Sequence, residues 1–270
     1  MELLETKSIS NQYGGLWAVK NVDFEIDSGQ TFGLIGPNGS GKTTFLNISS
    51  GIYSATNGRV FLDGEDITDL KPYQIFKKGI SRTYQSSRLC WDMSVADNLL
   101  VGTYTSQDYG LADTIFHPQK VNKRLAEFVE KSLDLLSYFN PGLIEKRYEL
   151  AKNIPHIDRR RIEITRALLS KPKVLLLDEP TSHLDFGNQM RTLNIIDKLA
   201  EEEFTVVMSS HFPDHAFISA DKVAIMKDCH IIDYGTPNEV ITEKNLEKAY
   251  NIGVKIMDLE EERKICIPLV

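Results

Sequence analysis

A glycine-rich loop between an apolar segment and a helical segment constrains this chain more than any other feature of its sequence. Residues 36–43 read Gly-Pro-Asn-Gly-Ser-Gly-Lys-Thr, and they follow the apolar segment 31–35. Glycines permit a tight turn and a close approach of the backbone to a ligand. The backbone N–H groups of such a loop and of the following helix point toward an anion, which predicts a phosphate site. The pattern therefore favours an α/β fold with the loop at the end of a buried strand.

Two side chains at the end of the loop suit a magnesium nucleotide. In loops of this kind the lysine amine, here Lys42, reaches the β- and γ-phosphates, and the hydroxyl, here Thr43, binds Mg²⁺. We therefore expect ATP and Mg²⁺ as ligands. The expected nucleotide-binding residues of the loop are consecutive in the chain: Gly36, Pro37, Asn38, Gly39, Ser40, Gly41, Lys42, Thr43 and Thr44.

A pair of acidic residues follows a second apolar segment. Residues 174–177 read Val-Leu-Leu-Leu, which is typical of a strand buried on both faces, and Asp178 and Glu179 come directly after it. Ligands bind at the carboxyl ends of strands in open α/β sheets. We expect Asp178 to hold Mg²⁺ through water and Glu179 to act as the general base toward the attacking water. Taken alone, the pair is as typical of a solvated turn, and the glycine loop decides for catalysis.

The remaining hydrophobic pattern predicts strands that alternate with helices, and therefore a mostly parallel core sheet. Segment 16–26 alternates as strands do, and 206–208 is a short buried strand. Segments 223–226 and 230–233 are expected to pair as a hairpin. Its turn reads Asp228-Cys229, where glycine is the usual second residue because it tolerates a positive φ.

The middle of the chain has a different pattern. Apolar residues between positions 121 and 139 recur at helical spacing, with charged residues on the other face. We predict a mostly helical subdomain over roughly residues 86–168. It is expected to lie within one nucleotide-binding domain, 1–257, that is followed by a C-terminal tail, 258–270.

Composition limits the expected partners and location. The net charge of -7 argues against nucleic acid as a partner, because phosphate-backbone binding usually shows a basic excess. The three cysteines, Cys90, Cys229 and Cys266, lack metal-ligand spacing and are expected to be reduced thiols. No apolar run approaches the roughly 20 residues that span a bilayer. The acidic segment 1–5 is unlike a secretory leader. Any membrane role is therefore expected to come through a partner.

The order of these motifs resembles that of the ABC ATPases. The matching positions are 36–44, Gln85, 174–180, 182–185 and His211, and the similarity runs over nearly the whole chain. The resemblance implies a P-loop NTPase of the α/β class, with a mostly parallel core sheet, an antiparallel β subdomain and a helical subdomain. It also implies that two such subunits enclose two ATP molecules and hydrolyse them to drive transport.

The resemblance assigns roles to residues that mean little alone. Tyr13 is similar to the aromatic residue that stacks on adenine, with Val19 packed nearby, and Gln85 to the residue that contacts Mg²⁺ and senses the membrane subunits. Asp185 is expected at the contact between subunits and His211 at the γ-phosphate. Without the resemblance, Tyr13 is typical of an edge-strand core residue and His211 of a capping histidine. The catalytic residues implied are Glu179, His211 and Gln85, and the metal-binding residues are Thr43, Gln85 and Asp178.

The signature loop departs from the family pattern. The family reads Leu-Ser-Gly-Gly-Gln, or Leu-Pro-Tyr-Gly-Gln in some importers, where this chain has residues 154–158, Ile-Pro-His-Ile-Asp. In the family this loop binds the γ-phosphate of ATP on the opposite subunit. Ile157 adds β-branched bulk where backbone must approach closely, and Asp158 adds negative charge near an anion. We therefore favour a heterodimer with a second ATPase subunit over a homodimer. The alternatives are a loop that tolerates these changes and a regulatory subunit that hydrolyses ATP poorly.

Two parts of the chain are similar to different importers. Segments 13–16, 34–47, 63–70, 79–85 and 95–102 resemble the ATPases of branched-chain amino acid importers. Segments 180–189, 208–216 and 235–253 resemble those of iron-chelate, cobalamin or molybdate importers. Because the helical subdomain contacts the membrane subunits in the family, we favour amino acid import.

The resemblance also implies partners and a location. It implies transmembrane permease subunits, a substrate-binding protein that acts indirectly, and a peripheral position on the cytoplasmic face of the cell membrane. An ABC ATPase of DNA repair or translation is the alternative from another functional class. Such proteins usually carry two cassettes, a long coiled coil or zinc-binding cysteines, and the sequence shows none of these.

Overall fold

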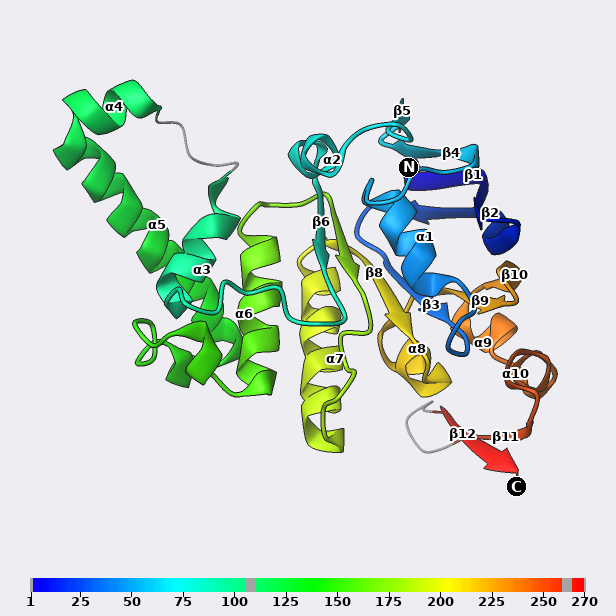
Figure 1. Ribbon diagram of the computed structural model, residues 1–270. Coiled ribbons are helices and arrows are strands. Elements are labelled where there is room, and N and C mark those ends of the chain that lie inside the picture. Colours follow the sequence, from blue (N-terminus) through cyan, green and yellow to red (C-terminus); the bar gives the residue numbers. More distant parts are fainter. Residues whose placement is uncertain (1, 105–109, 259–263, 270) are drawn as a thin grey trace. The chain divides into compact units, whose positions relative to one another are not determined.

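The computed structural model describes residues 2–104, 110–258 and 264–269. The chain divides into two compact units (Figure 1). The first comprises Met1–Arg82 and Lys173–Val270, and the second comprises Thr83–Pro172. The second unit contains the segment that the sequence predicts as a helical subdomain, with bounds a few residues wider at each end.

A six-stranded sheet forms the centre of the first unit. Its order is β10-β9-β3-β8-β7-β6. Strand β3 pairs in parallel with β8 and β9, β7 pairs in parallel with β8, and β10 is antiparallel to β9. This confirms the mostly parallel core sheet, and every residue of β3, β7 and β8 is buried. The strands are Thr31–Ile35 (β3), Ile80–Thr83 (β6), Val174–Leu177 (β7), Thr205–Ser210 (β8), Lys222–Lys227 (β9) and His230–Gly235 (β10).

A four-stranded antiparallel sheet in the same unit has the order β2-β1-β4-β5. Its inward-facing side chains and the apolar side of α1 belong to one hydrophobic core cluster. The antiparallel subdomain therefore packs against the helix that follows the glycine loop. The strands are Glu2–Tyr13 (β1), Leu16–Asp27 (β2), Asn57–Leu62 (β4) and Glu65–Asp66 (β5).

Helices connect the strands of the first unit, and α1 begins directly at the end of the glycine loop. The helices are Lys42–Ser49 (α1), Pro72–Lys78 (α2), Phe186–Glu201 (α7), Pro213–Ser219 (α8), Pro237–Val240 (α9) and Glu243–Tyr250 (α10).

The segment predicted as a C-terminal tail contains a strand. Strands β11 (Gly253–Asp258) and β12 (Lys264–Leu269) form an antiparallel pair. Val254 and Cys266 pack against a buried cluster of the first unit. The backbone N–H of Cys266 also donates to a carboxylate oxygen of Asp214, at 2.7 Å. In the described part of 258–270, strand β12 therefore packs against this unit, and the predicted domain boundary near residue 257 stays a prediction.

The turn between β9 and β10 keeps the geometry that its length requires. Asp228 and Cys229 both have positive φ, 45° and 69°, as the two central residues of a type I′ turn do. Cys229 thus takes the left-handed conformation itself. Its backbone N–H donates to the carbonyl of Ser40, at 3.2 Å, so the turn contacts the phosphate loop.

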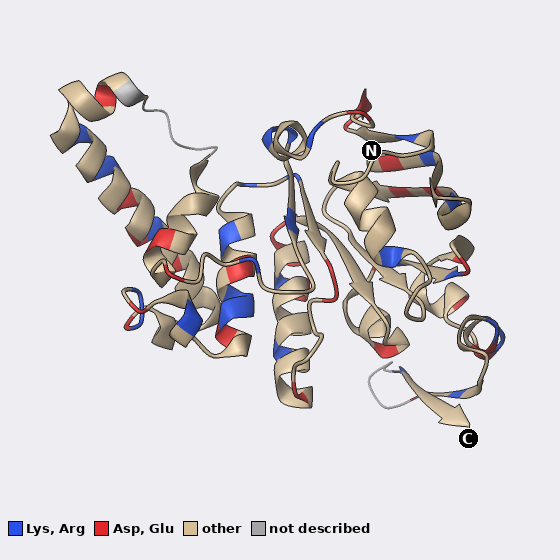
Figure 2. Ribbon diagram, viewed as in Figure 1, with Lys and Arg blue, Asp and Glu red and all other residues tan. Residues whose placement is uncertain are grey.

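The second unit is mainly helical, with a buried cluster between its helices. Figure 2 shows basic and acidic residues interspersed along α5, whose buried residues include Leu133 and Leu136. Among the described residues, no helix is long and apolar enough to cross a membrane. The helices are Val95–Gly102 (α3), Leu111–Phe116 (α4), Pro118–Phe139 (α5) and His156–Leu168 (α6), with 3-10 turns at Pro141–Leu143 and Ala151–Asn153.

Candidate functional site

The glycine loop between β3 and α1 has no room for side chains at two positions. A Cβ on Gly36 would lie 2.2 Å from the carbonyl oxygen of Met226, and a Cβ on Gly41 would lie 2.5 Å from that of Ala18. Their φ angles of +149° and +109° also disfavour other residues. The loop therefore lies close against the backbone of β2 and β9.

Lys42 folds back over this loop. Its Nζ donates to the carbonyls of Gly36 and Pro37, at 2.7 and 3.0 Å. Burial lowers the pKa of Lys42, and the negative charges of Glu179 and Asp178 oppose this decrease. The structure thus brings the predicted phosphate-binding lysine and the predicted acidic pair into one electrostatic site.

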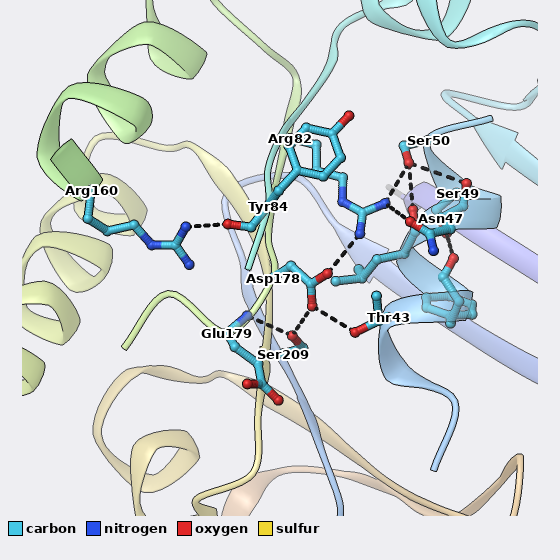
Figure 3. A network of polar contacts seen from close by, with 12 residues as sticks. Thr43, Asn47, Ser49, Ser50, Arg82, Tyr84, Arg160, Asp178, Glu179 and Ser209 are labelled. Atoms are coloured by element: carbon cyan, nitrogen blue, oxygen red, sulfur yellow. Dashed lines mark hydrogen bonds and ion pairs between the residues drawn. The ribbon is translucent and has the colours of Figure 1, made fainter. Parts of the chain in front are cut away.

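Asp178 is the centre of a polar network, drawn in Figure 3. Its Oδ1 accepts hydrogen bonds from Thr43 Oγ1, at 3.2 Å, and from Ser209 Oγ, at 2.9 Å. Its Oδ2 forms an ion pair with Arg82 Nη2, at 2.8 Å, and the Asp178 side chain is 1% exposed. The two residues predicted to hold Mg²⁺ in this unit, Thr43 and Asp178, therefore share a hydrogen bond.

Arg82 is a residue of this network that sequence reasoning missed. Its side chain is 4% exposed. Its Nη1 donates to Asn47 Oδ1 and Ser50 Oγ, at 2.7 and 2.9 Å, so it links α1 to the carboxylate of Asp178. Charged side chains are almost never fully buried unless they are paired. The feature of the sequence that could have identified Arg82 is a single arginine within a short buried strand.

Glu179 and His211 lie side by side at the ends of β7 and β8. Glu179 Oε1 is 3.6 Å from His211 Nδ1. This nitrogen is buried and has no hydrogen-bond partner among the described residues. Glu179 has a φ of 46°, a left-handed conformation that is uncommon with a side chain, and its N–H donates to Ser209 Oγ at 2.9 Å. The structure thus brings together the predicted base and the predicted γ-phosphate histidine.

Tyr13, predicted to stack on adenine, and Val19, predicted to pack nearby, differ in exposure. Tyr13 is 48% exposed. Its ring meets the edge of Tyr53, with ring centroids 5.7 Å apart. Val19 is fully buried, and its methyl group would lie 3.5 Å from a Cβ on Gly41, so it supports the loop from inside. Tyr13 is therefore accessible to a ligand, whereas Val19 does not offer surface to one. Tyr53 was not recognised from the sequence.

The roles predicted for Asp185 and Gln85 remain hypotheses. Asp185 caps α7, where its carboxylate accepts from the N–H and the side-chain amide of Asn188, at 2.9 and 2.7 Å. These hydrogen bonds hold the pKa of Asp185 below its ordinary value. Gln85 is exposed near the start of the second unit.

The altered signature loop forms the start of α6. Asp158 is 8% exposed, and its Oδ1 accepts from Asn140 Nδ2, at 2.9 Å, and from Arg161 Nη1, at 2.8 Å. The charge of Asp158 is therefore offset within the second unit, and the predicted repulsion of an anion by this residue stays a prediction. Ile157, which has a β-branched side chain, lies in the first turn of α6 and is half-buried.

The donor set of the first unit fits a magnesium nucleotide. Mg²⁺ usually takes one or two protein oxygens and completes its coordination with phosphate oxygens and water. Thr43 Oγ1 and Asp178 Oδ1 supply such oxygens. The buried hydroxyl of Ser40, within the loop, has no hydrogen-bond partner in the described part of the chain. A phosphate oxygen would provide one.

Comparisons with known proteins identify the family. A family model described as ABC transporter matches residues 19–182, which include the glycine loop and the acidic pair. The chain belongs to the ABC transporter family. It is an ATP-binding, ATP-hydrolysing subunit of such a transporter.

Two relatives match this chain over most of its length. BraF of Pseudomonas aeruginosa, a high-affinity branched-chain amino acid transport ATP-binding protein, is 30% identical over 249 residues, which cover 92% of this chain and 97% of BraF. LivG of Escherichia coli, whose name gives the same activity, is 30% identical over 252 residues, with coverage of 92% and 97%. The solved ADP conformation of the ATP-binding cassette MJ1267 matches with a TM-score of 0.78 and 27% identity, covering 93% of this chain and 99% of that one.

Proposed function

We propose that this ATPase subunit drives the import of branched-chain amino acids from the cytoplasmic face of the membrane. The observation that carries the substrate proposal is the identity of 30% over 92% of the chain to BraF, which is named for that activity. The absence of a membrane-spanning helix among the described residues fits a peripheral subunit held by permease partners.

The residues of the site suggest how the chain uses ATP. The N–H groups of the glycine loop and the amine of Lys42 hold the phosphates. Thr43 and Asp178 would hold Mg²⁺, which would supply positive charge beside the phosphates. Glu179 takes a proton from the attacking water. His211, whose Nδ1 lies 3.6 Å from Glu179 Oε1, contacts the γ-phosphate. Arg82 and Ser209 fix the carboxylate of Asp178 so that it need not reorganise during the reaction.

We also propose that the subunit pairs with a different ATPase subunit. The carboxylate of Asp158 is paired internally, so the argument now rests on Ile157, whose bulk stands where the family has glycine. In a homodimer this bulk would face both nucleotides. In a heterodimer the phosphate loop of this chain would face an unaltered signature loop.

The test is a purified complex of this chain with the membrane subunits that co-purify with it. The complex is reconstituted in vesicles with its binding protein, and ATP hydrolysis is measured with leucine, isoleucine or valine and with a ferric chelate. We expect stimulation by the amino acids. Stimulation by the ferric chelate alone would refute the substrate, and two copies of this chain per complex would refute the heterodimer.

A further inference from the structure

Tyr250, the last residue of α10, reaches the loop that carries His211. Its hydroxyl donates a hydrogen bond to the backbone carbonyl of His211, at 3.1 Å. Hydrogen bonding with the backbone of Gly36, the first residue of the glycine loop, lowers the pKa of the same hydroxyl. One hydroxyl therefore bridges the loop that binds the phosphates and the loop whose histidine lies beside Glu179.

The tyrosine is anchored by the C-terminal part of the first unit. It packs against a buried cluster that contains Ile35, directly before the glycine loop, and Leu246 of the same helix. Strand β12 completes this environment, because Cys266 belongs to the packed side chains. Burial raises the pKa of Tyr250, and the nearby charge of Asp214 acts in the same direction. The hydroxyl therefore stays protonated and can donate throughout the neutral pH range.

The residues on either side of His211 are fixed by separate contacts. Ser210 Oγ accepts a hydrogen bond from the N–H of Phe212, at 3.0 Å, and contacts His215 Nδ1 at 3.1 Å. The ring of Phe212 lies 4.0 Å from that of His211 between centroids. These contacts shape the His211 loop locally. Tyr250 instead links this loop to the glycine loop, which is distant in the sequence.

We propose that Tyr250 is a positioning residue for ATP hydrolysis, holding the backbone of His211 at a fixed distance from the glycine loop. The imidazole then meets Glu179 and the terminal phosphate in one arrangement. The proposal rests on the proposed roles of Glu179 and His211. A misplacement of about 1 Å at a reacting centre costs about 100-fold in rate. Loss of a single tether, with the ring still packed, should therefore cost about 5- to 50-fold in kcat.

Tyr250→Phe in the reconstituted complex tests this, because it removes the hydroxyl and keeps the ring. Tyr234→Phe is the matched control, since the Tyr234 hydroxyl also donates to a backbone carbonyl, that of Glu25 at 2.7 Å, but on β10. We expect kcat for ATP hydrolysis to fall about 5- to 50-fold in Tyr250→Phe, with KM for ATP changed less than about 3-fold. The control should match the wild-type complex in both constants.

A purely structural role for the hydroxyl would give a different result. In that case kcat at temperatures well below the melting transition would equal the wild-type value, which would overturn the proposal. A fall of kcat in both variants alike would also overturn it. If Tyr250→Phe behaves as wild type while Glu179→Gln abolishes turnover, this inference fails and the proposed function stands. If Glu179→Gln keeps full turnover, the proposed function fails, and this inference fails with it.

Discussion

Replacing Arg82 by methionine should destabilise the first unit markedly. Methionine has a similar length, but it removes the guanidinium that pairs with Asp178 at 2.8 Å, where the two side chains are 4% and 1% exposed. Removing one partner of a buried ion pair costs about 3–5 kcal/mol, because the remaining charge is left desolvated. At about 2–4 °C per kcal/mol for a chain of this size, the expected fall in Tm is about 6–20 °C.

Thermal unfolding of the purified chain, followed by circular dichroism without nucleotide, measures this effect. Arg59→Met is the matched control, because Arg59 pairs with Asp66 at the surface and is 68% exposed. Such pairs contribute about 0–1 kcal/mol. The double variant Arg82→Met with Asp178→Asn should recover part of the lost stability, since it also removes the stranded charge. A Tm for Arg82→Met within about 2 °C of wild type, or strictly additive losses in the double variant, would refute the reasoning.

Three further predictions concern the phosphate loop, a buried histidine and the signature loop. Lys42→Ala should abolish tight binding of Mg·ATP while the chain stays folded, and an unchanged Kd in a fluorescent-nucleotide titration would contradict the phosphate role of Lys42. Burial, with a smaller effect of His211, lowers the pKa of His215 from 6.5 to about 4. Between these pH values the unfolded chain binds a proton that the folded chain does not, so stability should fall by about 3 kcal/mol as pH drops from 6.5 to 4. In His215→Gln the free energy of urea unfolding should depend less on pH over this range, and equal slopes would count against the buried neutral imidazole. Ile157→Gly should raise ATP hydrolysis by the isolated chain severalfold, and no increase at any protein concentration would argue against Ile157 as the obstacle to homodimer activity.

The parts of the site that lie in consecutive residues were predictable from the sequence. The glycine loop depends on residues 36–43 alone, and the acidic pair follows directly from the apolar run before it. In both cases the strand before the motif fixes where its side chains emerge. The same reasoning gave β3 and β7 with their observed bounds.

Features that depend on distant partners were not predictable in this way. Arg82 matters because it meets Asp178, 96 positions later in the chain. The charge of Asp158 was evident, but its direction is set by Asn140, 18 positions earlier. Tyr250 is unremarkable in the sequence, and only the fold brings its hydroxyl to His211, 39 positions earlier. Sequence patterns report what a residue is, whereas these roles depend on which residue it meets.

Strands β1 and β12 are among those that the hydrophobic pattern did not predict. Strand β1 interrupts the alternation of buried and exposed residues, with a positive φ of 50° at Ser8 and irregular pairing with β2. Strand β12 contains a proline, which is unusual within strands, and it pairs with β11 at the end of the chain. Both strands are stabilised by pairing and packing that no short window of sequence contains.

The measurement that tests the central claim most directly is ATP hydrolysis by the reconstituted complex carrying Glu179→Gln. Exposed Glu247→Gln on α10 serves as the control. Phosphate release is measured at saturating Mg·ATP, and ATP affinity is measured separately. Removal of the general base should lower kcat by about 10²–10⁴-fold and leave ATP affinity nearly unchanged. Turnover at half the wild-type rate or more would show that another group activates the water, and would contradict the account of this site.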